Sequence, residues 1–371
     1  MTLLYSDVEE ELRASVRQLL ADRSPWRAVL ARAESDQPYD RALWRALAAG
    51  VGCAGLAIPE KWGGAGASWR EVAVVLEELG RAAAPVPFLG SALATAALLA
   101  NGETEAQTEL LAALAAGDRT AVLVIPLSTP PAAPVPVSVR AGGTALTGTV
   151  TSVADALPAD VLVVPTPDGL YAVEADRATL TRVTSLDLTR PLCDLRFDRA
   201  PARQLAPAGA VPAAWAAVKT TGAALLASEQ LGVAEWCLDT TVEYLKTRHQ
   251  FGRPVGQFQA LKHRLAELWV TITQARALAR YAAGCLADDD PDTPVAASLA
   301  QAHCSQVAVR AAEECVQMHG GIGFTWEHPA HLYLKRAKSA AIALGTPERH
   351  RAALAELVDL PPAATGAASA L

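Results

Sequence analysis

A block of short β-branched runs lies between two segments whose apolar residues recur at helical spacing, and this order limits the possible folds. The runs between residues 121 and 205 are AVLVIPL, SVRAG, TALTGTVTSV, DVLVVPT, GLYAVEAD, TLTRVTS and DLRFDRA. They follow one another about every ten residues and are separated by Gly, Pro and Asp, which is typical of a small antiparallel barrel or sandwich.

Helical patterns occupy both sides of this block. In the first segment Ser6 and Glu9 predict a capping box, and apolar periodicity predicts further helices over residues 41–49, 69–83, 90–100 and 103–115. After Pro212 the chain predicts long helices over residues 214–247, 258–284, 294–318 and 329–344, with a shorter one over 347–357. We therefore expect an α+β fold with an N-terminal helical domain (1–118), a middle β domain (119–208) and a C-terminal helical bundle (209–371).

Charge and cysteine content exclude several classes of function. The formal net charge of −7 argues against a nucleic acid or an anionic membrane as the main partner. Six scattered cysteines without a CxxC pair indicate buried thiols in a reducing compartment. The N-terminus is acidic where a signal peptide is basic, and the most apolar run, near residues 88–100, is too short to span a bilayer. We expect a cytoplasmic protein with no membrane span.

The first candidate site is the helix end KTRHQFGR, residues 246–253. One interpretation is purely structural: the cations complement the helix dipole and Gly252 caps the helix. The other is that Arg248 holds a phosphate ester with Phe251 beside a planar ring, because the planar guanidinium binds two phosphate oxygens at once.

The second candidate is QMHGGIGF, residues 317–324, at the end of a predicted helix. It is compatible with a helix C-cap and a tight turn, or with backbone that approaches a ligand where Cβ atoms would collide. The GGxG spacing and the absence of a preceding strand distinguish it from a Rossmann fingerprint.

Other catalytic and metal-binding patterns are absent from the sequence. It contains no GxSxG, GxxxxGK[ST] or HExxH motif. Three close pairs of histidine or cysteine lack the four-ligand spacing of a zinc site: His303–Cys304, Cys315–His319 and His328–His331. We expect no metal, and we expect tryptophans such as Trp269 and Trp326 to be packing residues.

Three of these stretches together resemble the acyl-CoA dehydrogenase family. They are PEKWGG at residues 59–64 (the family's PExxGG), RHQFG through Gln259 (RxxFGxxxxxxQ) and QMHGGIGF at residues 317–324 (QxxGGxGF). The last two stand in the family's order, about 70 residues apart. The resemblance implies the family fold, with an N-terminal helical bundle, a middle antiparallel β-barrel domain and a C-terminal four-helix bundle.

The resemblance also implies FAD and the α,β-dehydrogenation of an acyl-CoA thioester, in which a carboxylate removes the α-proton. In the family, the RxxFG and QxxGG segments hold the ADP half of a FAD whose ring lies in the neighbouring subunit. An electron-transfer flavoprotein is the acceptor that the family suggests. On this pattern the FAD-binding residues are Arg248, Gln250, Phe251, Gln259, Gln317, Gly320 and Gly321.

The family's catalytic glutamate has no counterpart at either of its usual positions. Many members place it directly before a Gly-Thr pair, where this chain has Leu344. The other position, on the helix before RxxFG, falls near Gly222. Glu229 and Glu235 are the remaining candidates for a substitute base, and we expect no catalytic residue at the family positions.

The middle block departs from the family as well. The TEP-x-AGS stretch that lines the flavin ring is reduced to Ser128-Thr129-Pro130, and the W-[IV]-T segment, here residues 149–153, lacks its tryptophan. Motifs that serve a neighbouring subunit are therefore kept, whereas those that serve the chain's own site are eroded.

This asymmetry predicts the non-catalytic subunit of a heteromeric (α2β2-type) acyl-CoA dehydrogenase, which supplies half of the FAD site to a homologous catalytic subunit. The run GFTWEHPAHLY, residues 323–333, resembles the subgroup that acts on bulky CoA thioesters such as steroid side chains. Two alternatives stay open: a self-sufficient homo-oligomeric dehydrogenase with an unrecognised base, and a flavin oxygenase or flavin-binding scaffold of the same fold.

Overall fold

The computed structural model describes residues 2–101 and 103–361 of the 371-residue chain. Its first part is helical, as expected, and the predicted capping box of Ser6 and Glu9 is confirmed; Ser68 and Glu71 form a second capping box. The helix predicted over residues 41–49 is α-helical only to Arg45 and continues as a π-helical turn, Ala46–Gly50. The helices are α1 (Asp7–Arg23), α2 (Trp26–Ala33), α3 (Arg41–Arg45), α4 (Trp69–Arg81), α5 (Phe88–Leu99) and α6 (Glu105–Ala115).

The middle part contains two four-stranded sheets, ordered β1-β4-β5-β8 and β2-β3-β7-β6. Of the two expected arrangements, barrel or sandwich, the structure has the sandwich, and one strand pair, β1 with β4, is parallel instead of antiparallel. Apolar side chains from both sheets, Leu162 and Phe197 among them, form a common core. The strands are β1 (Ala121–Leu123), β2 (Val139–Gly142), β3 (Ala145–Ala154), β4 (Val161–Thr166), β5 (Gly169–Glu174), β6 (Thr179–Val183), β7 (Leu192–Pro201) and β8 (Arg203–Pro207).

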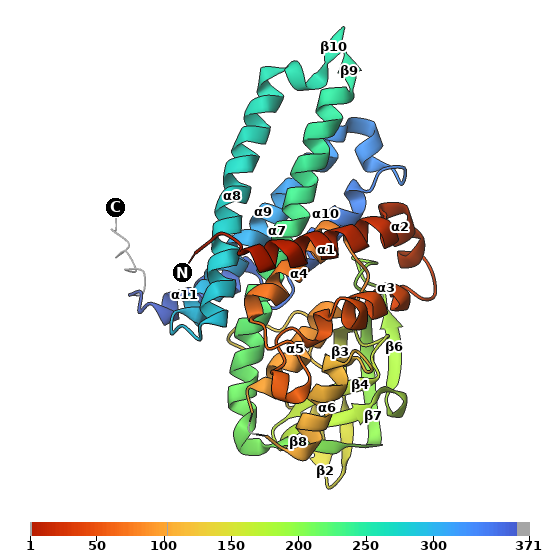
Figure 1. Cartoon of the computed structure of the whole chain (residues 1–371), viewed down its shortest axis with the longest axis vertical. Coiled ribbons are helices and arrows are strands. Elements are labelled where there is room, and N and C mark those ends of the chain that lie inside the picture. The colour runs from red at the N-terminus through yellow and green to blue at the C-terminus, as the bar shows by residue number, and fades with distance from the viewer. Residues whose placement is uncertain (1, 102, 362–371) are drawn as a thin grey trace, which may run out of the picture.

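The last part is a helical bundle around one central helix, α7 (Val211–Thr247). Figure 1 shows α7 and α8 extending together beyond the rest of the bundle as an arm that ends in a small hairpin, β9 (His249–Gln250) and β10 (Arg253–Pro254). The remaining helices are α8 (Gln259–Ala287), α9 (Thr293–His319), α10 (Ala330–Ala340) and α11 (Pro347–Leu357). The helix predicted to reach residue 344 ends at Ala340.

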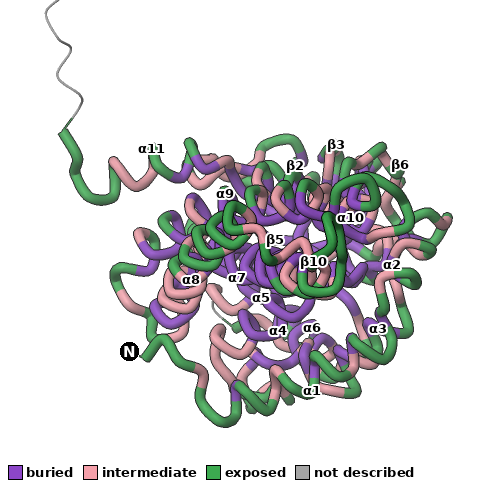
Figure 2. The backbone as a smooth tube through the Cα atoms, turned by 90° about the horizontal axis from the view of Figure 1, so that it is seen from above, coloured by how far each residue is buried: buried purple, intermediate pink, exposed green. Residues whose placement is uncertain are grey.

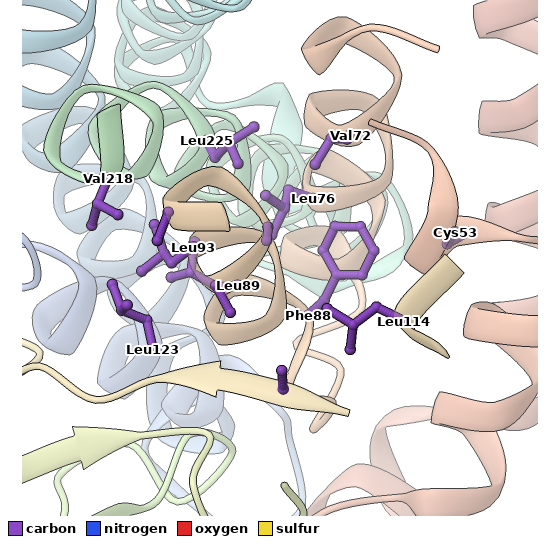
Figure 3. Packing of buried hydrophobic residues seen from close by; sticks show 14 of the residues in the cluster. Cys53, Val72, Leu76, Phe88, Leu89, Leu93, Leu114, Leu123, Val218 and Leu225 are labelled. Carbon is purple, nitrogen blue, oxygen red and sulfur yellow. The ribbon is translucent and has the colours of Figure 1, made fainter. Parts of the chain in front are cut away.

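Helix α7 connects the two helical parts of the molecule. Val218 and Leu225 of α7 lie in the same apolar cluster as Leu89 and Leu93 of α5 (Figure 3). Farther along α7, Ala227 and Leu231 belong to the cluster of the C-terminal bundle. Side chains of one helix therefore pack into two different cores, which fixes the position of α7 between them.

Two glycines allow α7 to cross α4 closely. A Cβ on Gly232 would lie 1.8 Å from the carbonyl oxygen of Glu77, and one on Gly80 would lie 2.0 Å from that of Glu229. Neither contact is possible for a real side chain, because the atoms that would have to move belong to the backbone. The crossing therefore requires glycine at both positions.

The cysteines are buried, whereas two of the tryptophans are exposed to solvent. All six cysteines are free and buried, as expected. Trp269 and Trp326, which we expected to be packing residues, are 56% and 54% exposed. Trp269 lies on α8, and the periodicity of that helix does not show which of its faces the rest of the chain leaves uncovered. Trp326 lies in a turn, where its ring contacts His331 and Lys335 while about half of the residue stays exposed.

One helical segment, Ala208–Thr247, is long and apolar enough to cross a membrane by length and composition alone. Its most apolar window is 61% buried inside the fold. The central helix of a protein core passes the same test, because it is surrounded by apolar neighbours.

Candidate cofactor-binding site and acid positions

The RxxFG segment forms the hairpin at the tip of the arm. Gln250 pairs with Arg253 and His249 with Pro254, so Phe251 and Gly252 make the turn. Both turn residues have positive φ, +54° and +73°, as in a type I′ turn. This geometry is unusual for a bulky residue, and it leaves the Phe251 ring 89% exposed. Gly252 therefore belongs to a hairpin turn and does not directly cap the helix.

The base of the hairpin is packed tightly against the end of α7. The amide of Val255 donates to the carbonyl of Arg248 over 2.8 Å. A Cβ on Gly256 would lie 2.9 Å from the carbonyl oxygen of Leu245, so the chain can approach α7 only with glycine there. The guanidinium of Arg253 lies 4.1 Å from the centre of the Phe258 ring, which precedes Gln259. Arg248, Gln250, Phe251 and Gln259 are all exposed, and the tube beside the β10 label in Figure 2 is largely green.

The QMHGG segment is the end of α9 and the turn that follows it. Gln317 is exposed, and Gly320 has φ +61°, a conformation that favours glycine. No atom lies within 4 Å of where a Cβ would stand on Gly320 or Gly321. At Gly323 a Cβ would lie 2.5 Å from the carbonyl oxygen of Val316, so the turn itself requires glycine there.

The exposed groups of these two segments suit the ADP half of FAD. Arg248 forms no ion pair with any residue that the structure describes, which leaves its guanidinium available for a phosphate. The space in front of Gly320 and Gly321 lets a ligand approach the backbone. The exposed Phe251 ring offers a surface for a planar group. Bound FAD would supply the electron acceptor for the dehydrogenation.

The two positions at which the sequence comparison predicts the family's catalytic glutamate, Gly222 and Leu344, lie against each other. A Cβ on Gly222 would stand 2.7 Å from Cδ1 of Leu344 and 2.9 Å from Cδ2 of Leu93. Leu344 is only 4% exposed. Apolar side chains therefore fill the space between these two positions.

A proline-rich loop closes the same region from the side of the β domain. The amide of Leu344 donates to the carbonyl of Leu127 over 2.7 Å, and a Cβ on Gly345 would lie 2.6 Å from Cδ of Pro131. Trp215 Nε1 donates to the carbonyl of Ala133 over 2.8 Å and so ties the loop to α7. This loop contains Ser128–Pro130, the stretch in which we expected a remnant of the family's ring-lining segment.

The two candidate substitute bases are held by arginines. Glu229 is fully buried and is bound by Arg190 and by Nε of Arg336, the latter at 2.9 Å. Burial opposes its ionisation, but these two guanidinium groups together lower the pKa of Glu229 to about 2. Glu235 is bound by Arg276 at 2.7 Å. Glu229, which two guanidinium groups hold as an anion, is therefore poorly suited to accept and release a proton near neutral pH.

No metal site accompanies these residues. In residues 2–101 and 103–361, no group of three or more His, Cys, Asp or Glu side chains is placed to hold a metal ion. Of the pairs considered above, Cys315 and His319 are in contact, with Sγ 3.6 Å from Nδ1.

Comparison with known proteins decides the family. The N-terminal domain of acyl-CoA dehydrogenases matches residues 6–118, and their C-terminal domain matches residues 219–358. The chain belongs to the acyl-CoA dehydrogenase family. Its fold and its cofactor, FAD, are those of this family of oxidoreductases. The acyl-CoA dehydrogenase IpdE2 of Mycobacterium tuberculosis is 41% identical over 336 residues, which cover 91% of this chain and 92% of that protein.

Solved structures of other acyl-CoA dehydrogenases share the whole architecture. One is the Tcur3481-Tcur3483 steroid ACAD (G363A variant), 31% identical, with a TM-score of 0.83 over 96% of this chain and 99% of that one. Another is the ChsE4-ChsE5 complex of Mycobacterium tuberculosis, 28% identical, with a TM-score of 0.85 over 98% and 100% of the two chains. Each of these structures is named after two proteins.

Proposed function

We propose that this chain is the non-catalytic subunit of a heteromeric acyl-CoA dehydrogenase and that it contributes half of a FAD site to a homologous catalytic subunit. The observation that carries the proposal is the contact between Leu344 and Gly222. Both acid positions lack a carboxylate, and the space between them is filled. The surface that would serve a neighbour, by contrast, remains exposed on the arm.

Each exposed motif residue has a role in this proposal. Arg248 binds a phosphate oxygen of FAD, and Gly320 and Gly321 let the cofactor approach the backbone. Phe251 lies against a planar ring of the cofactor. The amide side chains of Gln250, Gln259 and Gln317 donate to and accept from its polar groups.

The two structural relatives support a partner of the same fold, since one is a complex of ChsE4 with ChsE5 and the other is the Tcur3481-Tcur3483 steroid ACAD. We infer that the substrate is an acyl-CoA thioester with a bulky acyl group, bound in the catalytic partner, and that the assembly is an α2β2 heterotetramer. An electron-transfer flavoprotein is the proposed acceptor and the cytoplasm the proposed location. Residues 1–118, 119–208 and 209–371 are the proposed domains.

Purification of the tagged chain from its own cells tests the proposal. We expect a second acyl-CoA dehydrogenase subunit of similar size to copurify, with a glutamate at one of the two family positions and with bound FAD. The Arg248→Ala variant should still bring down the partner but retain less FAD. A chain that purifies alone with a full complement of FAD would overturn the proposal.

A further inference from the structure

Three aromatic rings lie in a row behind the Gly320–Gly321 turn. The imidazole of His319, the last residue of α9, lies between the Tyr244 ring of α7, at 4.4 Å, and the His328 ring, at 4.1 Å between ring centres. Its Nδ1 lies 2.7 Å from the carbonyl oxygen of Cys315 and therefore donates a proton to it. The His319 ring is 2% exposed, so it does not touch bulk solvent.

The row connects the two cofactor motifs, which are distant in sequence. The carbonyl of Tyr244 accepts from the amide of Arg248 over 2.9 Å, so Tyr244 belongs to the last turn of α7 before the hairpin. His319 directly precedes Gly320. His328 lies beyond the turn, and its Nδ1 accepts from the amide of Ala330, the first residue of α10, over 3.3 Å.

The outer imidazole of the row, that of His328, is neutral near pH 7. Burial is the main cause, and the neighbouring His319 and His331 add to it; together they lower the pKa of His328 to about 4. With Nδ1–H committed to the Cys315 carbonyl, Nε2 of His319 is buried without a hydrogen-bond partner. The main contacts of the His319 imidazole are therefore those between its ring and the rings of Tyr244 and His328.

We propose that His319 is a positioning residue: its ring, between Tyr244 and His328, fixes the Arg248 end of the arm relative to the Gly320–Gly321 turn. This inference rests on the proposed function, because both motifs must reach the same FAD for their relative position to matter. Replacement of the ring by a methyl group removes both face contacts and lets the two motifs move independently. The residue does not touch the cofactor itself, since its side chain is buried.

Amide hydrogen exchange of the chain without FAD or partner tests whether His319 holds the hairpin and the Gly320–Gly321 turn in place. In His319→Ala, exchange should become about tenfold faster both in the turn, residues 320–324, and in the hairpin, residues 248–253. His319→Phe keeps an aromatic ring in the row and should return the hairpin toward the wild-type rate. Unchanged exchange in residues 248–253 of His319→Ala would overturn the proposal.

The affinity of the heteromer for FAD tests the functional part. His319→Ala should raise the dissociation constant for FAD about tenfold, and His319→Phe should stay within about twofold of wild type. The matched control is Trp236→Leu, which removes another ring pair between α7 and α10, Trp236 on Tyr333 at 3.5 Å. It should lower the melting temperature without a change in FAD affinity.

The outcomes separate this inference from the function on which it rests. A wild-type complex without FAD would overturn the proposed function and this role of His319 together. A complex that holds FAD equally well with His319→Ala would overturn the role of His319 alone.

Discussion

The side chain of Leu344 lies directly on Gly222, so that a Cβ on the glycine would be 2.7 Å from Cδ1 of the leucine. These are the two positions at which the resemblance to the family predicts a catalytic glutamate. Leu344 also has φ +54°, which is costly for a leucine. The side chains of Leu344 and Leu93 fill the space next to Gly222.

A double-mutant cycle measures this contact. Gly222→Ala should lower the free energy of unfolding by about 1 kcal/mol, because overpacking outweighs the gain in helix propensity. Leu344→Ala should lower the free energy of unfolding by about 2–5 kcal/mol, because the smaller side chain leaves a cavity. The double variant should lose less than the sum, with a coupling of about 1 kcal/mol. Chemical denaturation gives all three values.

The control for this cycle is Gly209→Ala, since no atom lies within 4 Å of a Cβ there. The change in the free energy of unfolding caused by Gly209→Ala should add to the change caused by Leu344→Ala. If Gly222→Ala is also additive with Leu344→Ala, the two residues do not share the space that we describe.

Introduction of a carboxylate at residue 344 should not give the chain dehydrogenase activity. In Leu344→Glu the new carboxylate would be buried against Leu93 without a partner, at a cost of about 3 kcal/mol at neutral pH. Leu344→Met, which keeps the volume, should cost less than about 1.5 kcal/mol. Neither variant should bleach flavin with an acyl-CoA. A dehydrogenase active as a single chain with Leu344→Glu would show that only the base was missing.

Glu229 should make stability depend on pH in the acid range. Its pKa in the folded chain is about 2, below the ordinary value of 4.5, so its contribution is complete above 4.5 and is lost as the pH falls toward 2. Glu229→Gln should lower the free energy of unfolding by about 3 kcal/mol at pH 7, because Arg190 and Arg336 lose an ionised partner. The difference in the free energy of unfolding between wild type and Glu229→Gln should decrease steadily as the pH falls below 4.5.

The matched control is Glu243→Gln, which breaks an exposed pair with Lys246 on the same helix. It should leave the stability near that of wild type at every pH. A gap between wild type and Glu229→Gln that does not change between pH 5 and pH 2.5 would contradict the buried ion pairs.

Arg248 should matter for the cofactor and not for the fold. Its side chain is exposed, so Arg248→Ala should leave the melting temperature of the chain unchanged. In the heteromer it should weaken FAD binding about 100-fold, as expected for the loss of a charge-assisted pair of hydrogen bonds, and Arg248→Lys should recover part of this. Arg196→Ala, which changes an exposed arginine on β7, should bind FAD as the wild type does. Equal affinity in Arg248→Ala and wild type would contradict the assigned role.

Local signals predicted most of the helices, whereas contacts between distant segments were not foreseen. The capping box of Ser6 and Glu9 and the long helix α7 depend on neighbours in sequence, and both were predicted close to their observed positions. The parallel pair of β1 and β4 joins residues about 40 apart, and nothing in either run indicates the direction of its partner.

The same distinction applies to the site. Counting from the RxxFG motif and the Gly-Thr pair predicted that Gly222 and Leu344 occupy the positions of the family's catalytic glutamate. Only the structure shows that these two residues lie in contact. His319 stood inside a motif and was considered only as half of a possible metal pair with Cys315. Its role depends on Tyr244 and His328, from two other segments, so no local pattern could reveal it.

The most direct test of the account is an anaerobic titration of the chain alone, loaded with FAD, with acyl-CoA thioesters that carry short, long and steroid-like acyl groups. Absorbance at about 450 nm reports reduction of the flavin. The account predicts weak FAD binding and no bleaching by any thioester until a catalytic subunit is added. Stoichiometric FAD and rapid bleaching in the chain alone would contradict it.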